Sequence, residues 1–158
     1  MLHLIPAPLH RLAYRAAHAA RIRWWQWRKP DIASISVIAT DLDDRLLLVR
    51  HSYGSGSWSV PAGGIDRGEA PEDAARREFR EETGCEAGRL TFVGIQQESV
   101  YGSNNAIHVY AAKVQGNPKV DNREIVEARF FPLHSLPEPL SHLTRRRLDM
   151  WSNQSQQG

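Results

Sequence analysis

The chain has 158 residues, which is the size of one compact domain with short appendages. Its composition, 41% hydrophobic and 24% charged, is that of a soluble globular protein. The single cysteine, Cys85, excludes an internal disulfide, and no Cys/His cluster has the spacing of a zinc site. No apolar run approaches the roughly 20 residues of a membrane-spanning helix, and no signal peptide is recognisable. The sequence therefore predicts a cytoplasmic protein without a spanning membrane segment.

The charge is unevenly distributed along the chain. Residues 1–30 contain no acid and six basic residues: Arg11, Arg15, Arg21, Arg23, Arg28 and Lys29. The remainder has 14 basic and 18 acidic residues, a net charge of minus four. A nucleic-acid binder needs a basic surface on the domain itself, so we expect no nucleic-acid partner.

Residues 1–30 form the first predicted unit, a basic amphipathic helix from Leu9 to about Trp27. Its apolar residues recur at helical spacing, and Pro30 ends it because the residue before a proline disfavours the helical conformation. Such a helix usually packs on the body of its own chain or on a second subunit, which would make a homodimer. Its arginines and tryptophans also leave open a membrane-surface helix or a transit peptide.

Residues 31–151 form the second predicted unit, in which several strands are combined with two helices. Strands are expected at 34–40, 45–50, 90–98, 106–114 and 128–132, and helices at 72–83 and 141–151. Pro71 and Gly84 punctuate the first of these helices. This order predicts an α/β (α+β) fold with a mixed sheet between helices. Residues 152–158 are polar and are expected to form a disordered tail.

The chemistry is concentrated in residues 63–85, which contain seven carboxylates. On a helix, Glu78, Glu81 and Glu82 project from nearly the same face, where like charges repel. A hard divalent cation among them would relieve the repulsion, and Mg²⁺ or Mn²⁺ suits an all-oxygen site. Arg77 is placed to steady the array with its planar guanidinium group. A solvated acidic helix face is the alternative reading of the carboxylates alone.

The spacing of this segment resembles the signature of the Nudix hydrolases at every fixed glycine, glutamate and arginine. It reads Gly63-x5-Glu69-x7-Arg77-Glu78-Phe79-x-Glu81-Glu82-x-Gly84-Cys85. Phe79 and Cys85 stand where the family usually has aliphatic residues, and both remain apolar. The residues before the segment, 58–64, and the later stretch 124–133 are also similar to the family.

The resemblance implies a Nudix-type α/β/α sandwich, preceded here by the amphipathic helix. It also implies hydrolysis of a nucleoside diphosphate linked to another group, with Mg²⁺ or Mn²⁺ as cofactor. By similarity, Glu81 and Glu82 are the leading candidates for metal ligand and base. Glu78 would be a metal ligand, Glu69 an additional or outer ligand, and the Gly63 carbonyl would lie against the metal. A backbone that approaches an ion closely must lack a side chain, which suits glycine there.

Four residues outside the signature are further candidates. In relatives a carboxylate in the position of Glu124 acts as ligand or base, although an exposed loop acid is equally compatible with the sequence. Arg50 and His51 end a predicted strand near the expected substrate mouth and are candidates for phosphate binding, with a structural histidine as the alternative. Tyr101 follows at a position where an aromatic ring could stack on a base, or could simply belong to a loop.

A different class of function is compatible with the same residues. A non-catalytic Nudix domain could act as a nucleotide sensor or interaction module through the basic helix. Such domains generally lose signature glutamates, and none is lost here.

Overall fold

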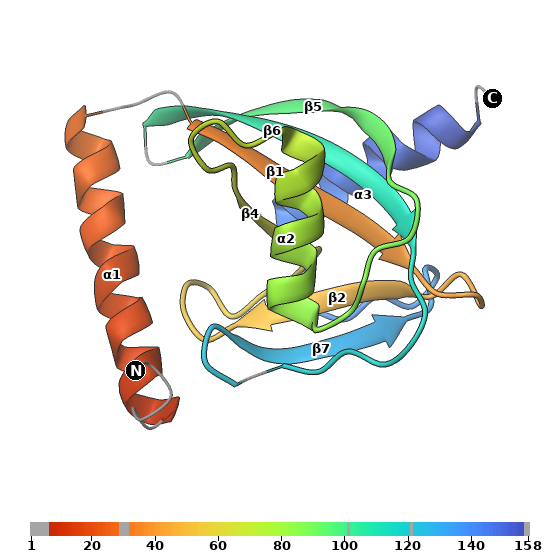
Figure 1. Ribbon diagram of the computed structural model, residues 1–158, viewed down its shortest axis with the longest axis horizontal. Helices are drawn as coiled ribbons and strands as arrows, with labels where there is room; N and C mark the ends of the chain where they lie inside the picture. Colours follow the sequence, from red (N-terminus) through yellow and green to blue (C-terminus); the bar gives the residue numbers. More distant parts are fainter. Residues whose placement is uncertain (1–6, 29–31, 101, 121, 157–158) are drawn as a thin grey trace.

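The computed structural model describes residues 7–28, 32–100, 102–120 and 122–156 (Figure 1). Within these ranges, the helices are α1 (Ala7–Arg28), α2 (Pro71–Thr83) and α3 (His142–Ser155). The strands are β1 (Ile32–Thr40), β2 (Leu46–His51), β3 (Trp58–Ser59), β4 (Ala62–Gly64), β5 (Thr91–Val100), β6 (Ser103–Lys113) and β7 (Ile125–Phe131).

Strand β1 lies at the centre of a mixed sheet. All nine of its residues pair in parallel with β6, and β6 pairs antiparallel with β5. On its other side, β1 meets β2 at Thr40 and Leu46, and β2 pairs antiparallel with β3 and β7. Residues 35–40 are buried without alternation, as expected for a strand covered on both faces.

Helices cover both faces of the sheet (Figure 1). Under α2 lies one apolar cluster, which includes Phe79, Cys85 and Val37. A second cluster lies on the α3 side and includes Ile38 and Trp58. The predicted α/β/α sandwich is therefore confirmed, and both apolar substitutes in the signature are core residues.

The ends of α2 follow from local sequence. Pro71 occupies the first turn, where no backbone N–H is needed, and Glu72 and Asp73 are acidic residues at the positive end of the helix dipole. At the other end, Gly84 has φ +69° and donates its N–H to the Arg80 carbonyl. A Cβ atom there would lie 2.7 Å from the Lys119 carbonyl oxygen, so both the conformation and the space require glycine.

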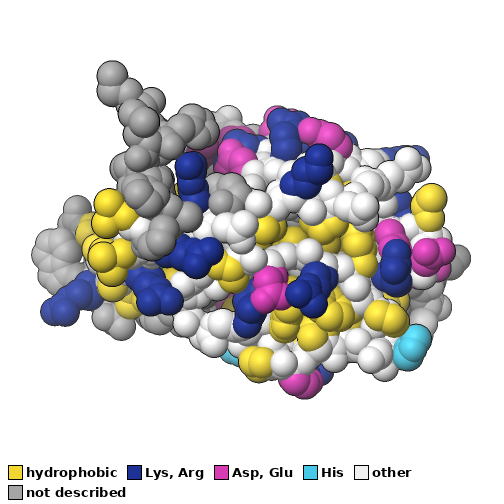
Figure 2. Space-filling model, turned by 90° about the horizontal axis from the view of Figure 1, so that it is seen from below, with side chains coloured by type: hydrophobic (Ala, Val, Ile, Leu, Met, Phe, Trp, Pro, Cys, Tyr) yellow, Lys and Arg dark blue, Asp and Glu magenta, His cyan; other side chains and the backbone are white. Residues whose placement is uncertain are grey.

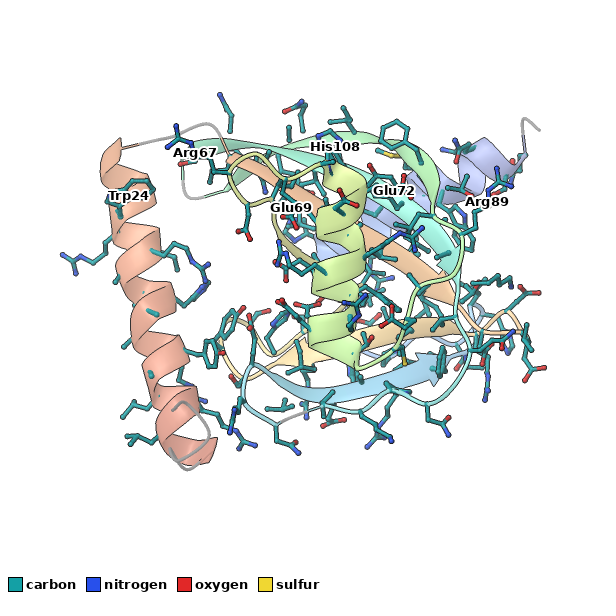
Figure 3. All side chains as sticks on the ribbon, viewed as in Figure 1. Trp24, Arg67, Glu69, Glu72, Arg89 and His108 are labelled. Carbon is teal, nitrogen blue, oxygen red and sulfur yellow. The ribbon has the colours of Figure 1, made fainter. Side chains whose placement is uncertain are left out.

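Helix α1 lies beside the end of β2 and the start of β7 (Figure 1), and its residues from Arg11 to His18 contact this part of the domain. Its C-terminal part includes the half-exposed Trp24, labelled in Figure 3. The predicted N-terminal helix is thus confirmed. None of the described helices combines the length and hydropathy needed to cross a membrane.

Two features of the fold differ from the sequence expectations. Strands β3 and β4 are absent from the strands expected from sequence, because strands of two and three residues are too short to show alternation. Helix α3 continues to Ser155, so the predicted disordered tail is wrong over residues 152–155. The Gln154 amide donates to the Phe92 carbonyl and ties this polar turn to β5. Residues 157–158 lie outside the described residues.

Candidate active site

The C-terminal half of α2 lines a cavity of about 260 Å³ with three glutamates. Glu78, Glu81 and Glu82 all face it, which confirms the shared helix face that their spacing predicted. The cavity is closed by residues from elsewhere in the chain: Tyr14, Glu124 and Ile125. This acidic cavity therefore joins the signature helix, the start of β7 and helix α1.

Gly63 permits the close approach of β4 to α2. A Cβ atom on Gly63 would lie 2.1 Å from Cδ of Glu78, far inside contact distance, whereas one on Gly64 would meet nothing within 4 Å. A side chain at this position would therefore displace the Glu78 side chain. The Gly63 backbone runs directly beside the carboxylate that the resemblance assigns to the metal.

Glu82 is the buried member of the set, with only 5% of its surface exposed. Its Oε2 accepts the backbone N–H of Ala62 at 3.1 Å, which fixes the carboxylate against β4. Burial raises the pKa of Glu82 well above its usual value, and the neighbouring charges of Glu124 and Glu78 act in the same direction. Burial likewise raises the pKa of Glu78. Burial therefore disfavours the ionised form of both carboxylates, although Glu78 also pairs with Arg77.

His51 joins this set from the end of β2. One ligand atom each from His51, Glu82 and Glu124 lies within 4.8 Å of the other two, and His51 Nε2 is 3.7 Å from Glu82 Oε1. Burial, followed by the charge of His18, lowers the pKa of His51 to about 4, so the imidazole is neutral at pH 7. The sequence assigned His51 to substrate; the structure places it among possible metal ligands.

Strand pairing brings His51 and Glu124 together. The antiparallel register of β2 and β7 shifts between Arg50 and His51, and the Ser52 N–H then donates to the Glu124 carbonyl at 2.8 Å. This irregularity turns His51 and the Glu124 side chain toward the cavity end of α2.

Tyr53 is a site residue that sequence reasoning missed. Its hydroxyl donates to Glu124 Oε1 at 2.8 Å and orients that carboxylate. Burial raises the pKa of Tyr53, and Glu124 adds to the shift, so the phenol stays protonated as a donor. Tyr14 and His18 of α1 lie against the Tyr53 ring, with centroids 6.5 Å and 4.7 Å away. No motif in the sequence marks these three residues.

Arg77 clamps the start of the signature. Its Nε and Nη2 donate to the two oxygens of Glu69, each at 2.8 Å, and its Nη1 donates to Glu78 at 2.8 Å. Nη2 also reaches the Gly64 carbonyl at 3.0 Å. The hydrogen bonds from Arg77 lower the pKa of Glu69 to about 2. Arg77 therefore positions Glu78 and β4.

The remaining candidates are placed as follows. Glu69, labelled in Figure 3, is held by Arg77 and is not brought together with His51, Glu82 and Glu124. Glu81 lines the acidic cavity with a side chain 61% exposed. Arg50 forms an ion pair with Glu127, and Tyr101 lies outside the described residues.

The donor set fits a hard divalent cation. Four carboxylates line one small cavity, two of them with raised pKa values, and a neutral imidazole lies at its edge. Clustered anions of this kind are costly unless a cation is bound among them. Oxygen-rich ligands of this type suit Mg²⁺ or Mn²⁺.

Comparisons with known proteins agree with this geometry. Residues 30–151 match the family model described as the NUDIX domain. An NAD-capped RNA hydrolase NudC from Vibrio atlanticus is 28% identical over 123 residues, which are 76% of this chain and 45% of the relative. The chain spans just under half the length of such NudC relatives.

Solved structures show the same fold. A MutT NUDIX hydrolase from Burkholderia pseudomallei superimposes with a TM-score of 0.70 and 29% identity, covering 78% of this chain and 98% of that one. The NUDIX domain of Shewanella oneidensis NrtR, solved with ADP ribose, has a TM-score of 0.69 at 16% identity, covering 79% of this chain and 88% of that one. With three signature glutamates gathered around one cavity and the family model matched over residues 30–151, the chain belongs to the NUDIX domain family.

Proposed function

We propose that this chain is a metal-dependent pyrophosphohydrolase, which hydrolyses the diphosphate of a nucleotide linked to another group. The observation that carries the proposal is the acidic cavity, in which Glu78, Glu81, Glu82 and Glu124 meet beside Gly63. The family match supports the reaction class, because the complete signature is present in the matched region.

The residues that would hold the cation are Glu78, Glu81, Glu82 and the Gly63 carbonyl, with His51 and Glu124 on the opposite side. When bound, Mg²⁺ or Mn²⁺ would neutralise phosphate charge and acidify a water molecule. We assign Glu69 to the outer shell, since Arg77 engages both of its oxygens.

Hydrogen bonds within the chain orient three of the carboxylates that line the acidic cavity. The Ala62 N–H fixes Glu82, Arg77 fixes Glu78, and Tyr53 fixes Glu124, each through a hydrogen bond of 2.8–3.1 Å. Carboxylates restrained in this way keep their geometry as substrate binds. Glu81 and Glu124 are the candidates for the base, because Glu78 and Glu82 are packed against β4.

The test is product release from a substrate panel with Mg²⁺, with Mn²⁺ and with a chelator. The panel contains nucleoside triphosphates, dinucleoside polyphosphates, ADP-ribose and sugar nucleotides. It also contains an NAD-capped RNA, since the NudC relatives bear that name and the sequence predicted no nucleic-acid partner. Turnover that the chelator abolishes supports the proposal; absence of turnover on every member with both metals contradicts it.

A nucleotide sensor is the second candidate, favoured by one observation. Tyr14 of α1 lines the same cavity as the glutamates. A nucleotide bound in the cavity would therefore contact a helix that lies outside the matched family region. Nucleotide binding without turnover would favour this role. Under either function we propose a cytoplasmic location. We also propose that the chain dimerises through exposed residues of α1 such as Leu9 and Leu12. Sedimentation of the full chain would test the dimer.

A further inference from the structure

A second cavity, of about 350 Å³, lies next to the acidic one, between α1 and the loop that follows β2. Its lining includes Arg11 and Arg15 of α1, Arg50 and His51 of β2, and Tyr53 of the loop. The two cavities share a wall, because the Tyr53 hydroxyl donates to Glu124, which lines the acidic cavity. We call this second space the basic cavity.

The basic cavity is opposite in charge to its neighbour. Three arginines line it and none of its described lining residues is acidic. In Figure 2, Lys and Arg side chains gather at the end of the molecule formed by α1, whereas elsewhere in that view basic and acidic side chains are interspersed. Arg50 is paired with Glu127, so Arg11 and Arg15 supply most of the charge available to an anion, and their planar guanidinium groups match phosphate oxygens.

The two arginines of α1 each use one guanidinium nitrogen in a hydrogen bond to the body of the domain. Arg15 donates through Nε to the Ser52 carbonyl at 3.2 Å, and Arg11 donates through Nε to the Asn122 carbonyl at 2.8 Å. Both bonds use the inner nitrogen and neutral acceptors, and neither guanidinium group forms an ion pair with another described residue. These bonds leave the outer nitrogens of both groups available to an anion.

The opposite wall has polar atoms without partners. Arg50 Nε, His51 Nδ1 and Ser52 Oγ are buried and make no hydrogen bond within the part of the chain that the structure describes. Buried polar atoms are almost always paired, so three exceptions at consecutive residues that line the cavity mark an unusual polar environment.

We propose that the basic cavity binds a phosphate group of the substrate other than the phosphate attacked beside the glutamates. The inference rests on the proposed function and narrows the substrate to molecules with a phosphate beyond the scissile diphosphate, such as a nucleoside triphosphate. Because α1 supplies two of the three arginines, this helix is part of the substrate site even though it precedes the matched domain.

The test measures binding of inorganic pyrophosphate to the full chain by calorimetry, at saturating Mg²⁺. Arg15→Gln and Arg50→Gln probe the two walls, and Arg23→Gln removes the same charge from α1 outside the cavity lining. We expect each wall variant to weaken binding about tenfold, the effect of one charge-assisted hydrogen bond, and the control to stay within about twofold of wild type. Near-wild-type binding by both wall variants, or an equal loss in the control, overturns the proposal.

Arg50→Gln keeps the test valid if Arg15→Gln undocks the helix, since Arg50 contacts Glu127 and Trp58 rather than α1. Glu127 retains Arg129 as a partner at 3.4 Å. Pyrophosphate binding needs no turnover, so an inactive protein with arginine-dependent binding would contradict only the proposed hydrolysis. An active enzyme whose pyrophosphate affinity is unchanged by both arginine substitutions would contradict only the proposed phosphate binding in the basic cavity.

The substrate arm of the test compares KM values. The wall variants should raise KM for a nucleoside triphosphate about tenfold and leave KM for ADP-ribose, which has only the diphosphate, within about twofold. Equal increases for both substrates would overturn the assignment to a further phosphate.

Discussion

The two walls of the acidic cavity are built in different ways. The α2 wall comes from one contiguous segment, in which Gly63, Glu78 and Glu82 are fixed by backbone contacts and dense packing. The opposite wall is assembled from α1, the end of β2 and the start of β7, and its members are held by single hydrogen bonds and ring contacts. We therefore expect substitutions in the α2 wall to have larger effects than substitutions in the opposite wall.

The largest expected effect is on the α2 wall. Glu82→Gln should lower kcat about a thousandfold, because it removes a buried charged ligand while keeping the Ala62 hydrogen bond. Since burial of this carboxylate raises its pKa, the variant should be at least as stable as the metal-free wild type at pH 7. Steady-state kinetics and thermal unfolding measure both. Glu72→Gln, an exposed change on the same helix, is the control; equal losses in the two variants would contradict the assignment.

The two glycines of β4 should respond differently to the addition of a methyl group. Gly63→Ala should reduce activity about a hundredfold, because its Cβ must displace the Glu78 side chain, and a small displacement of a catalytic group has an effect of that size. Gly64→Ala should stay within about twofold of wild type, because nothing lies within 4 Å of the added atom. Metal affinity, measured by titration of Mn²⁺, should follow the same order. If both variants behaved alike, packing at Gly63 would not control the site.

The opposite wall should respond more weakly. Tyr53→Phe removes the hydroxyl that orients Glu124, and loss of one hydrogen bond to a charged group should lower kcat/KM about tenfold. Tyr110→Phe makes the same change in the core away from the cavity and should leave kcat/KM unchanged. A Tyr53→Phe loss as large as that of Glu82→Gln would remove the distinction between the two walls.

The smallest effect concerns acid stability. The pKa of Glu69 is lowered to about 2 in the folded chain, so its ionised form stabilises the fold above the ordinary value near 4.5. That contribution is lost as pH falls from about 4.5 to 2. The melting temperature of Glu69→Gln should lie below that of wild type by a constant amount above pH 5, and the two should converge toward pH 2. A difference that does not change with pH would show that Arg77 gains nothing from the charge of Glu69.

The same contrast explains what the sequence could predict. Residues three or four positions apart on a helix lie close together, so the shared face of Glu78, Glu81 and Glu82 could be predicted from their positions. The meeting of His51 with Glu124 depends on a register shift between β2 and β7, which no local pattern encodes. The sandwich could be predicted from its helices and longer strands, whereas β3 and β4 are too short to show the alternating pattern of a strand.

Helix α1 shows the other limit of sequence reasoning. Its amphipathic pattern predicted a helix, and its basic charge suggested several partners, but neither property identifies the surface it contacts. The contacts of Arg11, Arg15 and Tyr14 are made with residues far along the chain, so only the structure reveals them.

The position of Cys85 has a practical consequence. This thiol, the only one in the chain, is buried under α2, and burial raises its pKa, which keeps it protonated and unreactive. A cysteine introduced at the exposed Ala20 would therefore be the single site open to a maleimide dye or spin label in the folded protein, with no need to remove the native residue. Spectroscopy on such a labelled chain could follow whether α1 moves as each candidate substrate arrives.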